Sequence, residues 1–158
     1  MTVMVLHIGE RWSCSAMWTR RAPRLRAPSP LVGTFRGVIK LVFCLRRLPT
    51  LSRAEFQTYW RETHAPLVAS VADTLEIRRY HQLHTVDDAI NDPIRASRGG
   101  PASYDGVAEL WWDSFESLAA PSQTEEGRAA GALLLEDERR FIDLTQSPLF
   151  LSQEHEVV

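Results

Sequence analysis

A short segment of the chain combines a titratable side chain with several aromatic ones. Residues 56–66 read FQTYWRETHAP, so that His64 lies four residues after Trp60 and two before Pro66. A spacing of four places both side chains on one face of a helix. Histidine is the commonest general acid or base near neutral pH. We therefore predict proton transfer at His64, with one alternative left open, in which the ring caps a helix end and bonds a backbone carbonyl.

A second set of polar side chains lies within residues 79–84. Side chains alternate between the two faces of a strand, so Tyr80, Gln82 and His84 share one face, which either meets solvent or lines a polar cavity. We take His84 as a candidate catalytic residue and the other two as candidates for substrate binding. His81 and His84 point to opposite faces and cannot chelate one ion, so we expect no metal site.

Three carboxylates could contribute to a site or to the core. Asp137 and Asp143 lie near the end of a second predicted long helix, and either could orient the imidazole of His64. Most helical carboxylates instead lie on a solvated face. We select Asp137 as a candidate catalytic residue. Glu109 interrupts an apolar strand and must be paired if it is buried, and Lys40 is its expected partner.

The chain is well supplied with aromatic side chains, which suit a flat aromatic ligand although some of them must fill core. Trp111 and Trp112 are neighbours in a predicted strand and point to opposite faces, so at most one of them can line a given cavity. We expect the walls of a ligand site to come from Tyr59, Trp60, Trp112 and Phe141.

The elements that position these residues begin with a strand, a helix and a strand. Residues 38–45 form an almost continuous apolar run, typical of a central strand. Ser52 and Glu55 form a capping box that begins the first helix, and Pro66 predicts a kink or break near His64. The helix should bury one stripe of side chains, namely Phe56, Trp60, Thr63, Leu67 and Val71. A second strand is predicted for residues 75–84.

A second unit of the same kind follows. It begins with a long polar loop at 87–103 and a strand at 105–112. A short helix, capped by Asp113 and Glu116, should end near Pro121. A longer helix should run from a capping box at Ser122 and Glu125 to about Phe141, and a last strand is predicted at 149–158.

This order predicts an α+β fold of the split ferredoxin-like type, βαββαβ, with one four-stranded antiparallel sheet. Right-handed crossovers would make the first and third strands central. Helices would cover only one face of the sheet. Because the other face needs a partner, we expect a homodimer.

Charge divides the chain at about residue 36. Residues 1–36 hold six arginines and one glutamate, a formal charge of +5, whereas residues 37–158 hold 12 basic and 19 acidic residues, a charge of −7. We interpret residues 1–36 as a flexible basic extension containing several prolines, with a transit peptide or a basic arm as alternatives. Residues 37–158 would be the folded domain. Its acidic balance argues against nucleic-acid binding.

Several other classes of protein are excluded or disfavoured. The apolar run at Met1–Ile8 is too short for a secretory signal and has no basic lead, and no segment approaches the ~20 apolar residues of a membrane span. Cys14 and Cys44 are the only cysteines and indicate neither a disulfide framework nor a thiolate metal site. We expect a cytoplasmic protein without a membrane partner.

Taken together, the motifs resemble the EthD-domain family of dimeric α+β barrels. They cover residues 37–158 in the family's order: IKLVF at 39–43, the segment 52–66 ending in TYWRETHAP, RYHQLH at 79–84, YDGVAELW at 104–111, and the segments 136–143 and 150–158. The resemblance implies that two sheets pack into an eight-stranded barrel with helices outside.

The resemblance implies a range of chemistries rather than one. Fungal relatives look like dehydratases or cyclising helpers acting on aromatic polyketides, and other dimeric α+β barrels include cofactor-free monooxygenases and isomerases. Fold alone does not choose among them. Our leading hypothesis is a cofactor-independent lyase or isomerase acting on an aromatic or polyketide-like molecule, with His64 as general acid or base. The alternatives are a non-catalytic accessory or ligand-binding protein and a cofactor-free monooxygenase.

Overall fold

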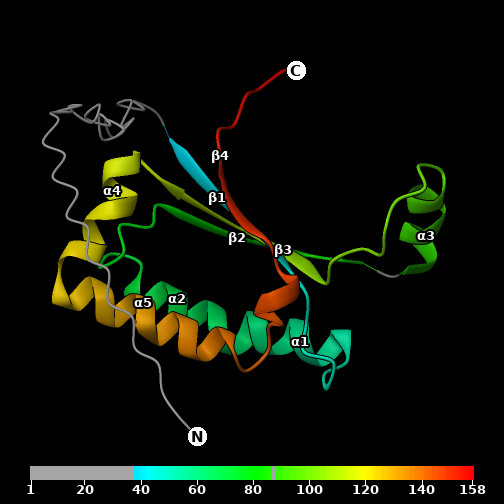
Figure 1. Cartoon of the computed structure of the whole chain (residues 1–158), viewed down its shortest axis with the longest axis horizontal. Helices are drawn as coiled ribbons and strands as arrows, with labels where there is room; N and C mark the ends of the chain where they lie inside the picture. Colours follow the sequence, from blue (N-terminus) through cyan, green and yellow to red (C-terminus); the bar gives the residue numbers. More distant parts are fainter. Residues whose placement is uncertain (1–37, 87) are drawn as a thin grey trace, which may run out of the picture. The chain divides into compact units, whose positions relative to one another are not determined.

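The computed structural model describes residues 38–86 and 88–158, so the predicted extension at 1–36 lies outside the described residues. The elements, labelled in Figure 1 where there is room, are β1 (Ile39–Leu45), α1 (Arg53–Tyr59), the π-helical turn η1 (Trp60–His64), α2 (Ala65–Val71), β2 (Arg79–His84), α3 (Asp88–Ala96), β3 (Gly106–Trp112), α4 (Phe115–Ala119), the 3₁₀ turn η2 (Ala120–Gln123), α5 (Glu125–Glu138), the 3₁₀ turn η3 (Leu144–Gln146) and β4 (Leu149–Ser152).

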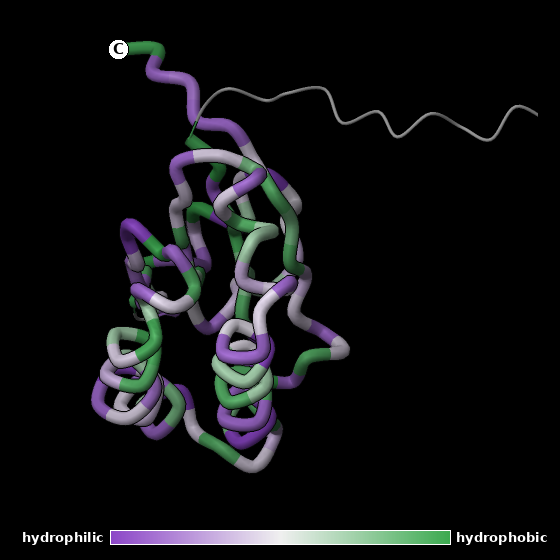
Figure 2. Tube along the Cα trace, turned by 90° about the vertical axis from the view of Figure 1, so that its left-hand side faces the viewer, coloured by the Kyte–Doolittle hydropathy of each residue, from purple (hydrophilic) through white to green (hydrophobic). Residues whose placement is uncertain are grey.

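The four strands form one antiparallel sheet in the order β2-β3-β1-β4. This is the split ferredoxin-like topology predicted from the order of elements, with the two most apolar strands, β1 and β3, at the centre. Helices α1, α2 and α5 lie together on one face of the sheet (Figure 1). Hydrophobic and hydrophilic residues alternate around the turns of the helices (Figure 2), as expected for helices with one buried side.

The main core lies between the sheet and the first helix. Phe43 and Leu45 of β1 point toward Phe56 and Trp60 of the helix, and Phe141 closes the cluster from beyond the end of α5. The ring centroid of Phe56 lies 5.6 Å from that of Trp60 and 5.6 Å from that of Phe141. This aromatic packing fixes the helix that carries His64 against the sheet.

A kink or break was predicted near His64. The chain does not break, because it stays helical from Arg53 to Val71, but a π-helical turn interrupts the regular helix at Trp60–His64. The Ala65 N–H bonds the carbonyl of Trp60, five residues earlier, which makes a wide π turn before the proline. Such a turn accommodates a residue that cannot donate a backbone hydrogen bond.

The π turn also changes which side chains are buried. The buried set is Phe56, Trp60, His64 and Val68, each four residues from the next. The predicted stripe is wrong at Thr63, which is exposed. A wide turn brings residues four apart nearly into line along the helix, which favours burial of His64, four residues after Trp60, over Thr63, three residues after it.

Other boundaries differ from the prediction for local reasons. The predicted loop contains α3. Its apolar residues Ile90 and Ile94 lie four apart, but the helix also contains Pro93 and buries none of its residues, so the polar composition predicted a loop. Strand β2 begins at Arg79 rather than 75 because the chain first turns through Glu76, whose φ is 55°. Strand β4 ends at Ser152, well before the predicted end at 158.

The capping box at Ser52 and Glu55 is confirmed. The caps of the later helices are displaced. Ser114, not Asp113, caps α4, and Thr124, not Ser122, caps α5 by accepting a hydrogen bond from the N–H of Gly127. Both positions offer a hydroxyl oxygen on an extended residue, which is what an N-cap requires.

The face of the sheet opposite the helices carries a charged pair. Lys40 Nζ lies 2.8 Å from Glu109 Oε1, as predicted, and also lies 4.7 Å from the ring centroid of Trp111. Trp111 is on this face and Trp112 on the helix face, again as predicted. Within the described residues, no helix is long and apolar enough to cross a membrane.

Gly106 is the point where the backbone of β3 comes closest to Trp60. A Cβ atom at this position would lie 2.5 Å from Cζ3 of Trp60 and 2.9 Å from the carbonyl oxygen of Leu83. Both distances are shorter than any ordinary contact. Only glycine therefore lets the indole lie flat against the start of β3.

We expect Gly106→Ala to destabilise the domain by about 1–3 kcal/mol, because the added methyl group overpacks the core. Gly131→Ala, on the exposed surface of α5 where a Cβ meets nothing within 4 Å, is the matched control and should be neutral or stabilising. Chemical denaturation followed by circular dichroism measures both. Equal stability of the two variants would show that Trp60 does not pack as described.

Candidate functional site

The imidazole of His64 bonds a carboxylate. His64 is 5% exposed, and its Nδ1 lies 2.8 Å from Oδ2 of Asp137. The alternative in which the ring caps a helix end and bonds a backbone carbonyl is therefore wrong. The bond joins η1 to the last turn of α5.

Asp137 is buried, contrary to the general expectation for a helical carboxylate. It is 7% exposed, and its Oδ1 accepts a hydrogen bond of 2.7 Å from the hydroxyl of Tyr59. One carboxylate oxygen of Asp137 thus bonds His64 and the other bonds Tyr59. Asp143, the other predicted candidate, instead caps η3 by accepting from the N–H of Thr145.

Phe141 holds the pair from the side. Its ring centroid lies 5.1 Å from that of His64 and 5.2 Å from that of Tyr59. Phe141 is fully buried and does not line the cavity described below, so it packs against the imidazole rather than facing a ligand space.

The surroundings of His64 favour the neutral form of its ring and leave one ring nitrogen without a partner. Burial lowers its pKa, and this outweighs the opposing effect of Asp137, which favours the charged form. A carboxylate can only accept, so Nδ1 carries the hydrogen and Nε2 keeps its lone pair. Among the described residues Nε2 has no hydrogen-bond partner. This nitrogen is therefore the one left for a ligand.

A small cavity of about 40 Å³ lies beside His64, between the helices and the sheet. Its polar lining consists of His64, Tyr80 and Glu138, and its apolar lining includes Trp60, Val68, Ala108, Leu110 and Leu134. This volume is about that of one water molecule. Three titratable groups thus meet at an otherwise apolar space.

Glu138 was not among the residues selected from the sequence. Burial, with a smaller contribution from the neighbouring Asp137, raises its pKa to about 7. In the described part of the chain it has no hydrogen-bond or ion-pair partner. Its inward position could have been predicted from the spacing, because Glu138 follows Ala130 and Leu134 at intervals of four on one side of α5.

The polar face of β2 packs against Trp60, and its three predicted residues are linked. The Tyr80 hydroxyl accepts hydrogen bonds from Trp60 Nε1 at 2.8 Å and from Gln82 Nε2 at 2.9 Å. Burial raises the pKa of Tyr80 to about 12. The phenol therefore keeps its hydrogen, and this hydrogen remains available for donation to a ligand.

His84 lies behind Trp60 rather than beside the cavity. Its ring stacks on the indole with centroids 4.7 Å apart, and its Nε2 lies 3.0 Å from Oε1 of Gln82. Burial lowers its pKa, with a smaller contribution from Arg61. Of the two histidines selected from the sequence, only His64 lines the cavity.

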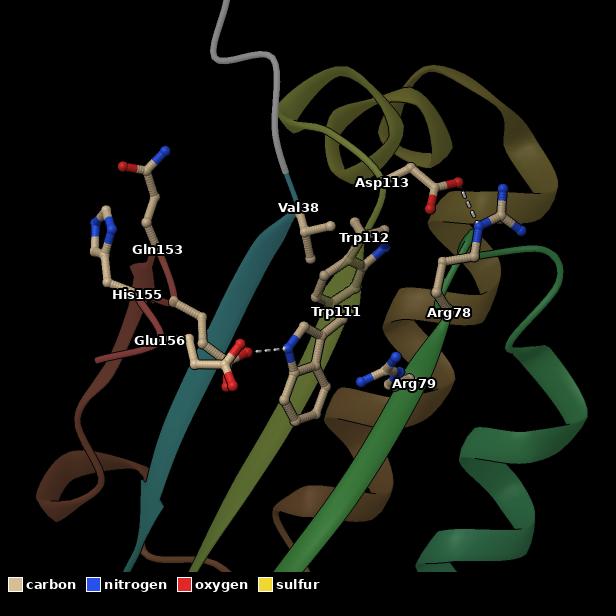
Figure 3. A pocket seen from close by; sticks show the side chains of 10 residues that line it. Val38, Arg78, Arg79, Trp111, Trp112, Asp113, Gln153, His155 and Glu156 are labelled. Carbon is tan, nitrogen blue, oxygen red and sulfur yellow. Dashed lines mark hydrogen bonds and ion pairs between the residues drawn. The ribbon is translucent and has the colours of Figure 1, made fainter. Parts of the chain in front are cut away.

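Trp112 lies away from His64. Its indole donates to the carbonyl of Leu75 at 2.8 Å and packs with Val68 and Ile77 in a separate core cluster. It borders a larger open hollow of about 770 Å³ at one end of the sheet, shown in Figure 3, where Trp111 donates to Glu154. The hollow is larger, but its titratable groups are exposed. The small cavity is the better candidate because its three titratable groups are buried or half-buried.

Among the described residues, no cluster of three His, Cys, Asp or Glu side chains is placed to hold a metal ion. The groups at the cavity are those of acid–base chemistry instead. They comprise a neutral imidazole, a phenol and a carboxyl group that titrates near neutrality.

The family profile for the EthD domain matches residues 48–145 of this chain. This span runs from just before α1 to η3 and includes the cavity-lining residues named above. The chain belongs to the EthD-domain family. The resemblance drawn from the sequence is thereby confirmed. A comparison with curated proteins found no match.

Solved structures of EthD-type and other ferredoxin-like proteins are similar. An EthD family protein from Bacillus halodurans is 23% identical with a TM-score of 0.50, covering 75% of this chain and 99% of that one. A dimeric protein of unknown function and ferredoxin-like fold from Bacteroides fragilis is 9% identical, with a TM-score of 0.49 and coverages of 76% and 99%. SnoaB, a cofactor-independent oxygenase from Streptomyces nogalater, is 13% identical, with a TM-score of 0.47 and coverages of 77% and 97%. At these identities only the fold is shared.

Proposed function

We propose that this EthD-domain protein is a cofactor-independent enzyme that removes a proton from a carbon next to a carbonyl group, with His64 as the base. The observation that carries the proposal is the buried imidazole of His64, which is bonded through Nδ1 to Asp137 and lines a small cavity; burial also lowers its pKa. An imidazole held in one tautomer by a buried carboxylate is a common arrangement for a general base.

The proton transfer follows from these groups. Nε2 takes a proton from the carbon, the C–H electron pair forms the double bond of an enolate, and the negative charge moves to the carbonyl oxygen. The imidazolium that results is stabilised by the carboxylate of Asp137, whose own charge is supported by the hydroxyl of Tyr59. Tyr80 donates its hydroxyl hydrogen to the enolate oxygen, as in an oxyanion hole.

The aromatic character proposed for the substrate rests on the side chains around the cavity. Trp60 is the wall on the first helix. The ring of His84 stacks on its indole, and Gln82 Nε2 donates to its backbone carbonyl at 2.9 Å. A cavity of 40 Å³ does not admit an aromatic ring. Binding of an aromatic substrate therefore requires this cavity to widen.

A purely ligand-binding role is the second candidate, and the burial of His64 against Phe141 favours it. In that case Asp137, Tyr59 and Phe141 would hold His64 only as part of the core. The two roles differ in whether His64 exchanges protons with a bound ketone. Consumption of dioxygen with a phenol would point instead to the monooxygenase alternative.

We expect the protein to catalyse exchange of the protons next to the carbonyl of α-tetralone for deuterium, measured by proton NMR in D₂O. His64→Gln should slow this exchange by about 100-fold or more, because it removes the base. His155→Gln, at an exposed position near the C-terminal end, is the matched control and should leave the rate unchanged. Binding of the ketone without exchange would instead support the ligand-binding role.

We further propose that the protein is a homodimer joined through the uncovered face of the sheet. Leu83 of β2 is 46% exposed on this face, where it pairs with Val107 beside the Lys40–Glu109 ion pair. An uncovered sheet face with exposed apolar side chains is typical of an interface. The dimer would be of the eight-stranded barrel type that the family resemblance implies.

Light scattering at micromolar concentration should give twice the chain mass of 17.9 kDa. Leu83→Asp should yield monomers, since it buries an unpaired charge in the interface. Leu133→Asp is the matched control, because this leucine is 44% exposed on α5, on the opposite side of the sheet. A monomeric wild-type protein would refute the dimer.

A further inference from the structure

The site as described has a base but no group assigned to protonate what leaves the substrate. We propose that Glu138 is this proton donor, and that the reaction is the loss of water from a β-hydroxy aryl ketone. This inference rests on the proposed function of His64 and adds both a second catalytic residue and a substrate class.

Convergence of three elements on one small space supports the assignment. His64 comes from η1, Tyr80 from β2 and Glu138 from α5, and all three line the same cavity of about 40 Å³. The other lining residues named above are apolar. Glu138 and the base therefore border the same small, largely apolar space.

Glu138 also lacks the contacts that a structural carboxylate makes. Its neighbour Glu136 is exposed and pairs with Arg140 at 3.4 Å, and Asp137 accepts from both His64 and Tyr59. Glu138 has no such partner among the described residues. A partly buried carboxyl group without a partner lowers stability, so its position calls for another explanation.

The protonation states of the facing groups fit the two roles. The pKa of Glu138 near 7 leaves much of it protonated at neutral pH, whereas the lowered pKa of His64 keeps the imidazole neutral. Tyr80, the third titratable group on the cavity, stays protonated, and Asp137 on the same helix is the nearby charge that favours the neutral form of Glu138. Acid and base are therefore ready together near neutrality.

The polar groups of the cavity suit a departing water molecule. A buried water needs two to four polar partners. His64, Glu138 and Tyr80 line the same cavity and provide three. Once the cavity has widened to admit the substrate, these groups can bind the water that the reaction releases.

The step balances without an oxidant or a reductant. His64 Nε2 removes the proton between the carbonyl and the hydroxyl-bearing carbon, and the electron pair forms the new C=C bond. The C–O bond breaks with its electrons, and the departing hydroxide takes the proton of Glu138 and leaves as water. Transfer of a proton from the imidazolium to the Glu138 carboxylate, directly or through that water, restores both groups.

Two probes test the proposal on the whole protein. The β-hydroxy derivative of α-tetralone yields fluorescent α-naphthol when it loses water, whereas α-tetralone itself has no leaving group and reports only deuterium exchange. Glu138→Gln should slow naphthol formation by about 100-fold and leave exchange within about twofold of wild type. Glu136→Gln, two residues earlier on α5, is the control and should change neither rate.

The outcomes separate the two proposals. Naphthol formation by Glu138→Gln at the wild-type rate, or none by the wild type, would overturn the inference while exchange still reports on His64. Exchange that survives in His64→Gln would overturn the proposed function itself. A loss of both rates in Glu138→Gln would assign Glu138 to positioning of the base, which also contradicts the inference.

Discussion

The hydrogen bond between His64 and Asp137 is the contact on which the proposed site depends. It joins residues 73 positions apart and connects the first helix with the last turn of α5. Asp137 holds the ring in one tautomer, and Tyr59 supports the carboxylate from its other side. Without this bond the ring could present either nitrogen to the cavity, and a buried charge on Asp137 would lose a main partner. One interaction therefore links the first helix to α5 and sets the tautomer of the imidazole.

Much of the fold could be predicted because its signals are local and strong. The apolar runs of β1 and β3, the capping box at Ser52 and the order of elements all follow from short-range rules. His64 and Asp137 could be selected because each stands out in its own segment. Their pairing could not be predicted, since nothing in the sequence measures the distance between two helices packed on one sheet.

Other features escaped for identifiable reasons. An irregularity near His64 was predicted from Pro66, but its form as a π turn depends on how the helix packs, which propensity rules do not give. Trp112 joined a different core cluster because strand parity gives its face and not its neighbours. Glu138 was missed because a carboxylate on a helix is normally solvated. Its inward position follows from the register of α5, which only the packed structure reveals.

The central claim is that His64 is a neutral base whose Nε2 lone pair is free at the cavity. Nitrogen-15 NMR of labelled histidine in the unliganded protein tests it directly, because the ring-nitrogen shifts distinguish the two neutral tautomers from the imidazolium. At neutral pH we predict the tautomer with hydrogen on Nδ1, and a pKa for His64 below its ordinary value. A charged ring at neutral pH, or hydrogen on Nε2, would contradict the account.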